Sequence, residues 1–138
     1  MSGDDDPGVI RSLAISAADV VDAFVYTREN PGTSVLRVTP PFHGRMRARI
    51  HVSHGTDRAT DAIHVSPADL LADAVVSEFP TLAAIEGDLP DEASPERVRE
   101  ARADALEAWR DRATDAIVDE TTIETDCGTT RVSVARLD

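Results

Sequence analysis

Residues 44–53 alternate strictly between apolar and cationic side chains. The alternating residues are Arg45, Met46, Arg47, Ala48, Arg49, Ile50, His51 and Val52. A period of two residues is that of a β-strand, in which successive side chains point to opposite faces of a sheet. The pattern therefore predicts one strand with an apolar face on a core and an opposite face that carries a row of positive charge.

Capping residues and turns divide the rest of the chain. Ser16 with Asp19 three residues later is typical of a helix start, and Ser94-Pro95-Glu96 begins the longest predicted helix. Cys127-Gly128 fits a two-residue hairpin turn. The predicted strands are 9–15, 34–39, 44–53, 62–65, 121–126 and 130–137. The predicted helices are 16–29, 66–75 and 94–119, with a single helical turn at 82–85.

This order, β-α-β-β-β-α-α-β-β, is dominated by local hairpins. It predicts an α+β fold with a mostly antiparallel sheet, one long helix in the C-terminal half and a final hairpin. A chain of 138 residues is the size of one domain. We expect a single α+β domain over residues 9–138, preceded by a disordered acidic tail over residues 1–8.

The charged residues are unusual in kind. The chain has 14 arginines and no lysine, 17 aspartates and 9 glutamates, and a net charge of −12. Short carboxylate side chains without lysine are the composition expected of a protein that works near salt saturation, where screening removes most self-repulsion. The composition indicates a salt-in halophile, and a haloarchaeon in particular.

Other features of the sequence exclude several classes of protein. Cys127 is the only cysteine, so an intrachain disulfide is excluded. The acidic N-terminus lacks the apolar run of a signal peptide, and no apolar stretch approaches the length of a membrane span. We therefore expect a cytoplasmic protein that does not act in a membrane.

The arginine-rich strand is the candidate functional site. The residues assigned to it are Phe42, Arg45, Arg47, Arg49 and His51. For Phe42 the alternative is a rigid connection after Pro40-Pro41 in which its ring folds onto the edge of the core. Arginine binds carboxylate and phosphate groups through two parallel hydrogen bonds, so the expected partner is an acidic protein or a phosphate-bearing ligand. Nucleic acid is disfavoured, because molar salt weakens phosphate binding and Phe42 is the only stacking side chain at hand. The sequence does not predict an oligomeric state.

Other interpretations of the same residues remain open. The arginines could pair internally with carboxylates of the long helix, or pair with another chain in a structural subunit. The histidines His43, His51, His54 and His64 fall close together, and His51 with His54 could bind a metal together with Asp57 or Asp61 in a small enzyme. His64 is expected to be partly buried. The sequence assigns no catalytic residue, no metal ligand and no cofactor.

Three segments resemble a known family. They are IRSLA at residues 10–14, LRVTPPFHGRMRAR at residues 36–49 and AWR at residues 108–110. The chain is similar, over nearly its whole length, to a family of small haloarchaeal proteins with a domain of unknown function. The resemblance implies a single domain and a halophilic source, and it implies no activity, cofactor or catalytic residue.

Overall fold

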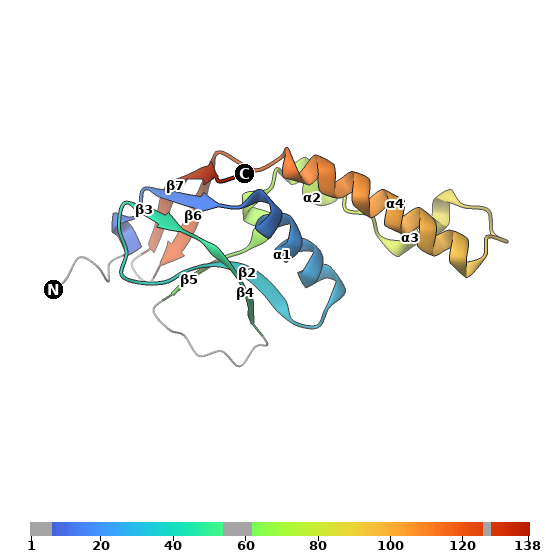
Figure 1. Cartoon of the computed structure of the whole chain (residues 1–138), viewed down its shortest axis with the longest axis horizontal. Helices are drawn as coiled ribbons and strands as arrows, with labels where there is room; N and C mark the ends of the chain where they lie inside the picture. The colour runs from blue at the N-terminus through green and yellow to red at the C-terminus, as the bar shows by residue number, and fades with distance from the viewer. Residues whose placement is uncertain (1–6, 54–61, 126–127) are drawn as a thin grey trace.

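The computed structural model describes residues 7–53, 62–125 and 128–138. Over these residues the chain forms four α-helices and seven strands in two sheets (Figure 1). The strands are β1 (Ser12–Ile15), β2 (Thr33–Val38), β3 (Arg45–Arg47), β4 (Arg49–Ser53), β5 (Ile63–Val65), β6 (Glu120–Thr125) and β7 (Gly128–Arg136). The helices are α1 (Ala17–Glu29), α2 (Asp73–Ser77), α3 (Leu82–Asp88) and α4 (Pro95–Thr114).

The two sheets differ in strand direction. Sheet A has the order β3-β1-β7-β6, and sheet B has the order β4-β2-β5. Sheet B is antiparallel, whereas in sheet A β1 runs parallel to both of its neighbours and only β6 and β7 form a hairpin. The predicted α+β class, long helix and final hairpin are confirmed. The expectation of a mostly antiparallel sheet has to be corrected, because there are two sheets and one of them is mixed.

The predicted strand 44–53 is two strands. Ala48 is fully buried between them, and its N–H donates to the carbonyl oxygen of Ala14 at 3.0 Å. On one side of Ala48, β3 pairs with β1 in sheet A; on the other, β4 pairs with β2 in sheet B. Alternation reports which side chains face the core and carries no information on which strand is the neighbour, so the change of sheet is invisible in the pattern.

Two predicted helices are shorter than expected for one shared reason. The segment after Ser66 forms a 3-10 helix, Pro67–Leu70, before α2, and α4 ends at Thr114. The backbone between these elements is used for pairing instead: Ala72 N–H donates to Ala116 at 2.9 Å, and Val118 N–H donates to Leu70 at 3.0 Å. These bonds between segments distant in sequence replace the helical ones.

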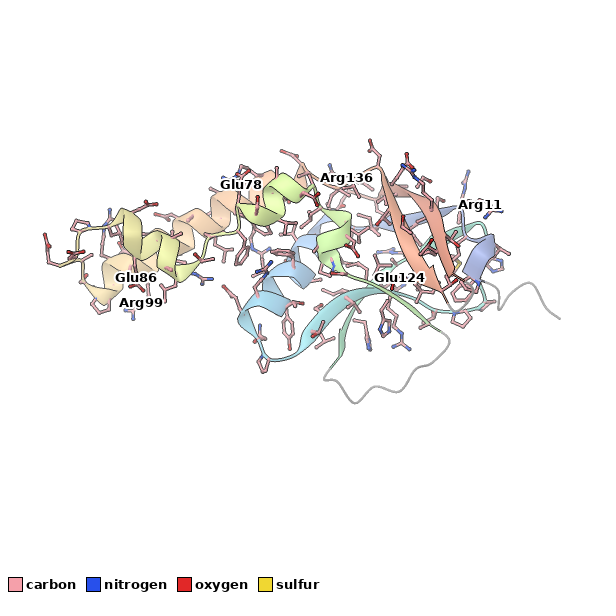
Figure 2. The ribbon with its side chains drawn as sticks, turned by 180° about the vertical axis from the view of Figure 1, so that it is seen from behind. Arg11, Glu78, Glu86, Arg99, Glu124 and Arg136 are labelled. Carbon is pink, nitrogen blue, oxygen red and sulfur yellow. The ribbon has the colours of Figure 1, made fainter. Side chains whose placement is uncertain are left out.

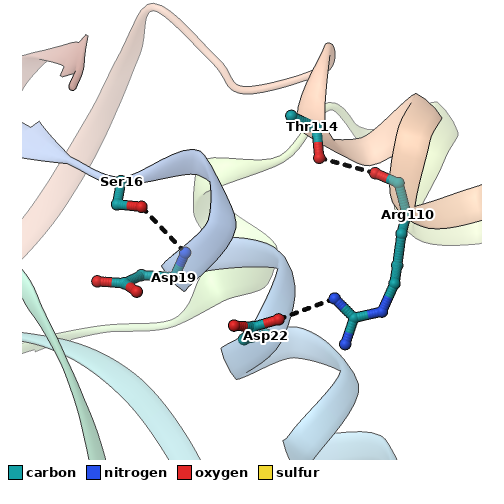
Figure 3. Close-up of polar contacts among 5 residues, drawn as sticks. All are labelled: Ser16, Asp19, Asp22, Arg110 and Thr114. Atoms are coloured by element: carbon teal, nitrogen blue, oxygen red, sulfur yellow. Dashed lines mark hydrogen bonds and ion pairs between the residues drawn. The ribbon is translucent and has the colours of Figure 1, made fainter. Parts of the chain in front are cut away.

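Two of the three predicted helix starts, at Ser16 and Ser94, are confirmed, whereas Ser66 precedes the 3-10 helix and makes no side-chain cap bond. The Ser16 hydroxyl accepts from the N–H of Asp19 at 3.4 Å (Figure 3). The Ser94 hydroxyl accepts from the N–H of Arg97 at 3.1 Å. Each bond satisfies a helical donor that has no partner within the helix.

In the final hairpin, Gly128 has a positive φ of 122°, which favours glycine. It is however the first residue of β7 and lies opposite Thr125, so it is not the second residue of the turn as predicted. Cys127 lies outside the described residues, as do residues 1–6, whereas Pro7–Val9 form one 3-10 turn.

Three aromatic rings join the helices to the core. Trp109 of α4 is fully buried and lies 5.2 Å from Phe24 of α1 and 4.9 Å from Phe79, measured between ring centroids. Its indole N–H donates to the Val75 carbonyl oxygen of α2 at 2.7 Å. Beyond Trp109, α3 and most of α4 extend away from both sheets as a helical arm, along which Glu78, Glu86 and Arg99 are spread (Figures 1 and 2). No described helix is long and apolar enough to cross a membrane.

The carboxylate of Asp138 caps the start of α1. It accepts from the N–H of Ala17 at 2.7 Å and from the hydroxyl of Ser16 at 3.1 Å. The hydrogen bond from the Ala17 N–H holds the pKa of Asp138 below its ordinary value of 3.8; desolvation opposes this effect, and the weaker contribution of the Ser16 hydroxyl lowers the pKa further. Both bonds favour the ionised form, as does the positive end of the helix dipole.

We expect Asp138→Ala to lower the melting temperature at pH 7 more than Asp119→Ala, at an exposed residue away from any helix start. Because the folded-state pKa is depressed, this stabilisation is present above the unfolded pKa and is lost as the pH falls through the folded one. The difference in melting temperature between wild type and Asp138→Ala should therefore shrink below about pH 4. Thermal unfolding by circular dichroism over pH 2.5 to 7, in constant salt, measures it. A difference that does not change with pH would contradict the assignment.

Candidate anion-binding site

The outer face of sheet B carries four cationic or titratable side chains. In the strand register, Arg37 of β2 lies opposite Arg49 of β4 on one side and His64 of β5 on the other. Residues directly opposite in antiparallel strands point to the same face. His51 follows Arg49 by two residues and shares that face, which is the one turned away from buried Leu36 and from α1. We call Arg37, Arg49, His51 and His64 the cationic face.

Arg37 and Arg49 carry like charge directly opposite each other on neighbouring strands. Like charges directly opposite each other in neighbouring strands are destabilising, by a few tenths to about 1 kcal/mol. None of the three strands of sheet B contains an aspartate or a glutamate that could offset the charge from within the sheet.

Arg37 fixes the state of the His51 ring. Its Nη1 lies 3.3 Å from Nδ1 of His51. A guanidinium only donates, so His51 must accept at Nδ1, which places any ring proton on Nε2. The His51 ring also lies 5.7 Å from the ring of His64, between centroids. The face therefore presents guanidinium donors beside an imidazole whose Nε2 can donate as well.

Arg45 and Arg47 stand on the neighbouring sheet. They lie opposite Ser12 and Ala14 of β1, so they share the outer face of sheet A. Both are exposed, as is Arg49, and none of the three takes part in an ion pair among the described residues. The predicted set of three arginines is thus split across two sheets, with Arg49 on one side of Ala48 and Arg47 on the other.

The long helix does not neutralise these arginines. Its ion pairs use its own arginines, namely Arg102 with Glu29 at 2.9 Å, Arg110 with Asp22 at 2.8 Å and Arg112 with Glu78 at 3.5 Å. Figure 3 shows the second of these, between α4 and α1. Internal pairing of Arg45, Arg47 or Arg49 with carboxylates of the long helix is therefore not found in the described residues.

Two expected positions differ from those observed. Phe42 is 2% exposed and belongs to the core, so its ring is not available to a ligand at the surface. His64, expected to be partly buried, is exposed on the cationic face. Sequence reasoning also missed Arg37, because only the pairing of β2 with β4 and β5 shows that it lies between Arg49 and His64.

A groove lies next to the cationic face. It has a volume of about 740 Å³ and runs between β5, the 3-10 helix, α2 and β6, with His64 at one margin and Glu124, labelled in Figure 2, on the β6 side. Its floor includes Val65, Leu71 and Ile123, and its margins include Asp69 and Asp73. The groove is therefore acidic at the margins, in contrast to the neighbouring face of sheet B.

The possible metal site cannot be assembled from the described residues. Among them, no three histidine, cysteine, aspartate or glutamate side chains converge as metal ligands. His54, Asp57 and Asp61, which the sequence offered as partners of His51, lie outside the described residues.

Comparison with protein families gives one match. The model of the domain of unknown function DUF8009 covers residues 1–138. The chain belongs to the DUF8009 family. The predicted resemblance to a family with a domain of unknown function is confirmed at this level, and a haloarchaeal origin stays a prediction. No curated protein and no solved structure matches this DUF8009 domain.

The geometry of this DUF8009 domain suits the binding of an anion. Adjacent strands lie about 4.8 Å apart, so the Cα atoms of Arg49, Arg37 and His64 span two such spacings. Guanidinium groups at this separation can each place two donors on one carboxylate or phosphate group, or share a larger anion.

Proposed function

We propose that this DUF8009 domain is a non-enzymatic binding module that holds an acidic or phosphate-bearing partner on its cationic face. The observation that carries the proposal is the exposed guanidinium group of Arg49, which takes part in no ion pair among the described residues and stands on a sheet whose strands contain no carboxylate. Such a group can form charge-assisted hydrogen bonds with a carboxylate or phosphate group of a partner. Arg45 and Arg47, exposed on the adjoining strand, extend the positive surface.

The proposal includes a salt-rich cytosol as the working environment. It is supported by the absence of lysine and by the net charge of −12. At about 1 M salt the screening length is near 3 Å, so charge alone gives little attraction at a distance. Binding there depends on short, charge-assisted hydrogen bonds with defined geometry, which arginine provides and a flexible lysine does not.

Replacing Arg45, Arg47 and Arg49 with serine is expected to leave the fold nearly intact. All three side chains are exposed, and exposed substitutions usually change stability by no more than about 0.5 kcal/mol each. The same triple variant should weaken binding of inorganic tripolyphosphate at least tenfold, because the donors leave with the guanidinium groups. Isothermal titration calorimetry in about 1 M KCl, with circular dichroism of the same samples, measures both.

A matched control is available elsewhere in the chain. Arg97, Arg99 and Arg136 are also exposed and make none of the ion pairs among the described residues. Arg97 and Arg99 lie on α4, and Arg136 ends β7 opposite Ile15, on the other face of sheet A from Arg45 and Arg47. Their triple serine variant removes the same charge away from the proposed site, so it should bind tripolyphosphate as the wild type does. Equal weakening in both variants would mean that only net charge matters. Unfolding of the Arg45, Arg47 and Arg49 variant would assign these arginines a structural role.

A further inference from the structure

One continuous segment forms the outer edge of both sheets. β3 is the last strand of sheet A and β4 is the last strand of sheet B, and only Ala48 separates them along the chain. Among the described residues, no strand pairs with the outer side of β4. An outermost strand presents backbone donors and acceptors on which a further strand can form.

The apolar layer of sheet B is incomplete at this edge. Ile50 of β4 lies opposite Leu36 of β2, on the face that packs against α1. Leu36 is fully buried, whereas Ile50 is 41% exposed and is one of three large apolar side chains exposed in the described chain. Ile50 is therefore an exposed apolar side chain at the outer strand of sheet B, and an added strand would cover it.

The charge along β4 decides which kind of peptide strand can pair with it. Edge strands commonly carry charge to prevent unwanted pairing, and here the charge is positive: Arg49 stands on the opposite face of β4 from Ile50, and Arg47 lies just before it. These side chains repel a basic segment and attract an acidic one. A strand has period two, so the segment that fits has acidic residues on the Arg49 side and apolar residues on the Ile50 side.

We propose that β4 binds an extended acidic polypeptide, in which acidic and apolar residues alternate, as an added strand of sheet B. This proposal rests on the proposed function, because Arg49 of the cationic face supplies the charge, and it names the partner as an extended peptide rather than a free anion. Backbone hydrogen bonds to β4 give the peptide its orientation. Carboxylates beside Arg49 and an apolar side chain over Ile50 give specificity.

The test uses an acetylated and amidated heptapeptide of alternating aspartate and valine, with a fluorophore for anisotropy, in about 1 M KCl. Two further peptides carry N-methyl groups on one or the other alternate set of residues, which removes donors from one edge at a time. A fourth has the same composition with the aspartates grouped at one end. The alternating peptide should bind, one N-methylated form should bind at least tenfold more weakly than the other, and the grouped peptide should bind weakly.

Protein variants locate the site independently of the peptides. Arg49→Ser and Ile50→Asn should each weaken the alternating peptide about tenfold, whereas Leu82→Asn, at an exposed apolar position on the remote α3, should not. Amide hydrogen exchange should slow in β4 on peptide binding. Equal affinity of all four peptides would overturn the added strand. The proposed function would then survive if tripolyphosphate still binds, and it would fall with the inference if neither tripolyphosphate nor any peptide binds.

Discussion

Dilution of KCl from about 3 M to about 20 mM is expected to unfold this domain, with most structure lost below roughly molar salt. Salt strengthens the burial of apolar surface and screens repulsion between carboxylates, and both effects fade on dilution. The core depends on small side chains, since Ala17, Ala23, Ala48 and Ala113 are all among its fully buried members. Each alanine buries little area, so the gain at about 25 cal/mol per Å² is small.

The helical arm should be the first part to unfold. α3 has no buried residue, and α4 buries only Trp109 and Ala113, both near its C-terminal end. Residues 78–108 carry nine acidic side chains against three arginines. With little packing and much like charge, this region gains most from screening.

Far-UV circular dichroism during stepwise dilution gives the midpoint, and amide hydrogen exchange at each step shows whether the arm opens before the sheets. A matched variant with Glu86→Gln, Asp88→Asn, Asp91→Asn and Glu92→Gln lowers the negative charge of the arm. Its midpoint should move to lower salt, because less repulsion needs screening. The same spectrum and the same melting temperature in about 20 mM and about 3 M KCl would refute salt dependence, and with it the argument for a halophilic source from composition.

The local elements of this fold could be predicted from the sequence because their causes are local. The capping serines Ser16 and Ser94, the glycine of the final hairpin and the apolar stripe of α1 each act within a few residues. The change of sheet at Ala48 could not be predicted, since it depends on β1, whose partners Met46 and Val134 are both distant from Leu13 in sequence. The predicted helices 66–75 and 94–119 are interrupted or end early for the same kind of reason. The backbone of residues 70–72 pairs with that of residues 116–118, which are distant in sequence.

The candidate site was predicted in part for a related reason. Arg45, Arg47, Arg49 and His51 are recognisable because they alternate within one segment, and the structure leaves the three arginines exposed. Their neighbours on sheet B come from other strands. Arg37 follows Leu36 in a strand with no other charge, so nothing local distinguishes it from a solvated surface residue, and only the register places it between Arg49 and His64. Alternation identifies a face, and pairing decides which side chains share it.

Trp109→Ala is expected to destabilise the domain by about 3–5 kcal/mol, the usual cost of removing a buried aromatic side chain. The indole is fully buried and contacts the rings of Phe24 and Phe79, so truncation leaves a cavity where α1, α2 and α4 meet. It also removes the donor to the Val75 carbonyl oxygen. A domain of this size is stable by about 5–15 kcal/mol, so the variant should be near the limit of folding.

Trp109→Phe separates the contribution of the buried ring from that of the hydrogen bond to Val75. It keeps most of the aromatic volume but cannot donate to Val75, so we expect a loss of about 1–3 kcal/mol from the unsatisfied carbonyl group. Urea unfolding in about 3 M KCl, followed by circular dichroism, measures both variants without changing the salt. Because Trp109 is the contact that joins the arm to α1 and α2, Trp109→Phe should also speed amide exchange in α4 more than in β7. A loss of less than about 1 kcal/mol in the free energy of unfolding of Trp109→Ala would mean that the three-ring cluster does not hold α4 to the core. The exposed ion pairs of Arg102, Arg110 and Arg112 would then have to hold it.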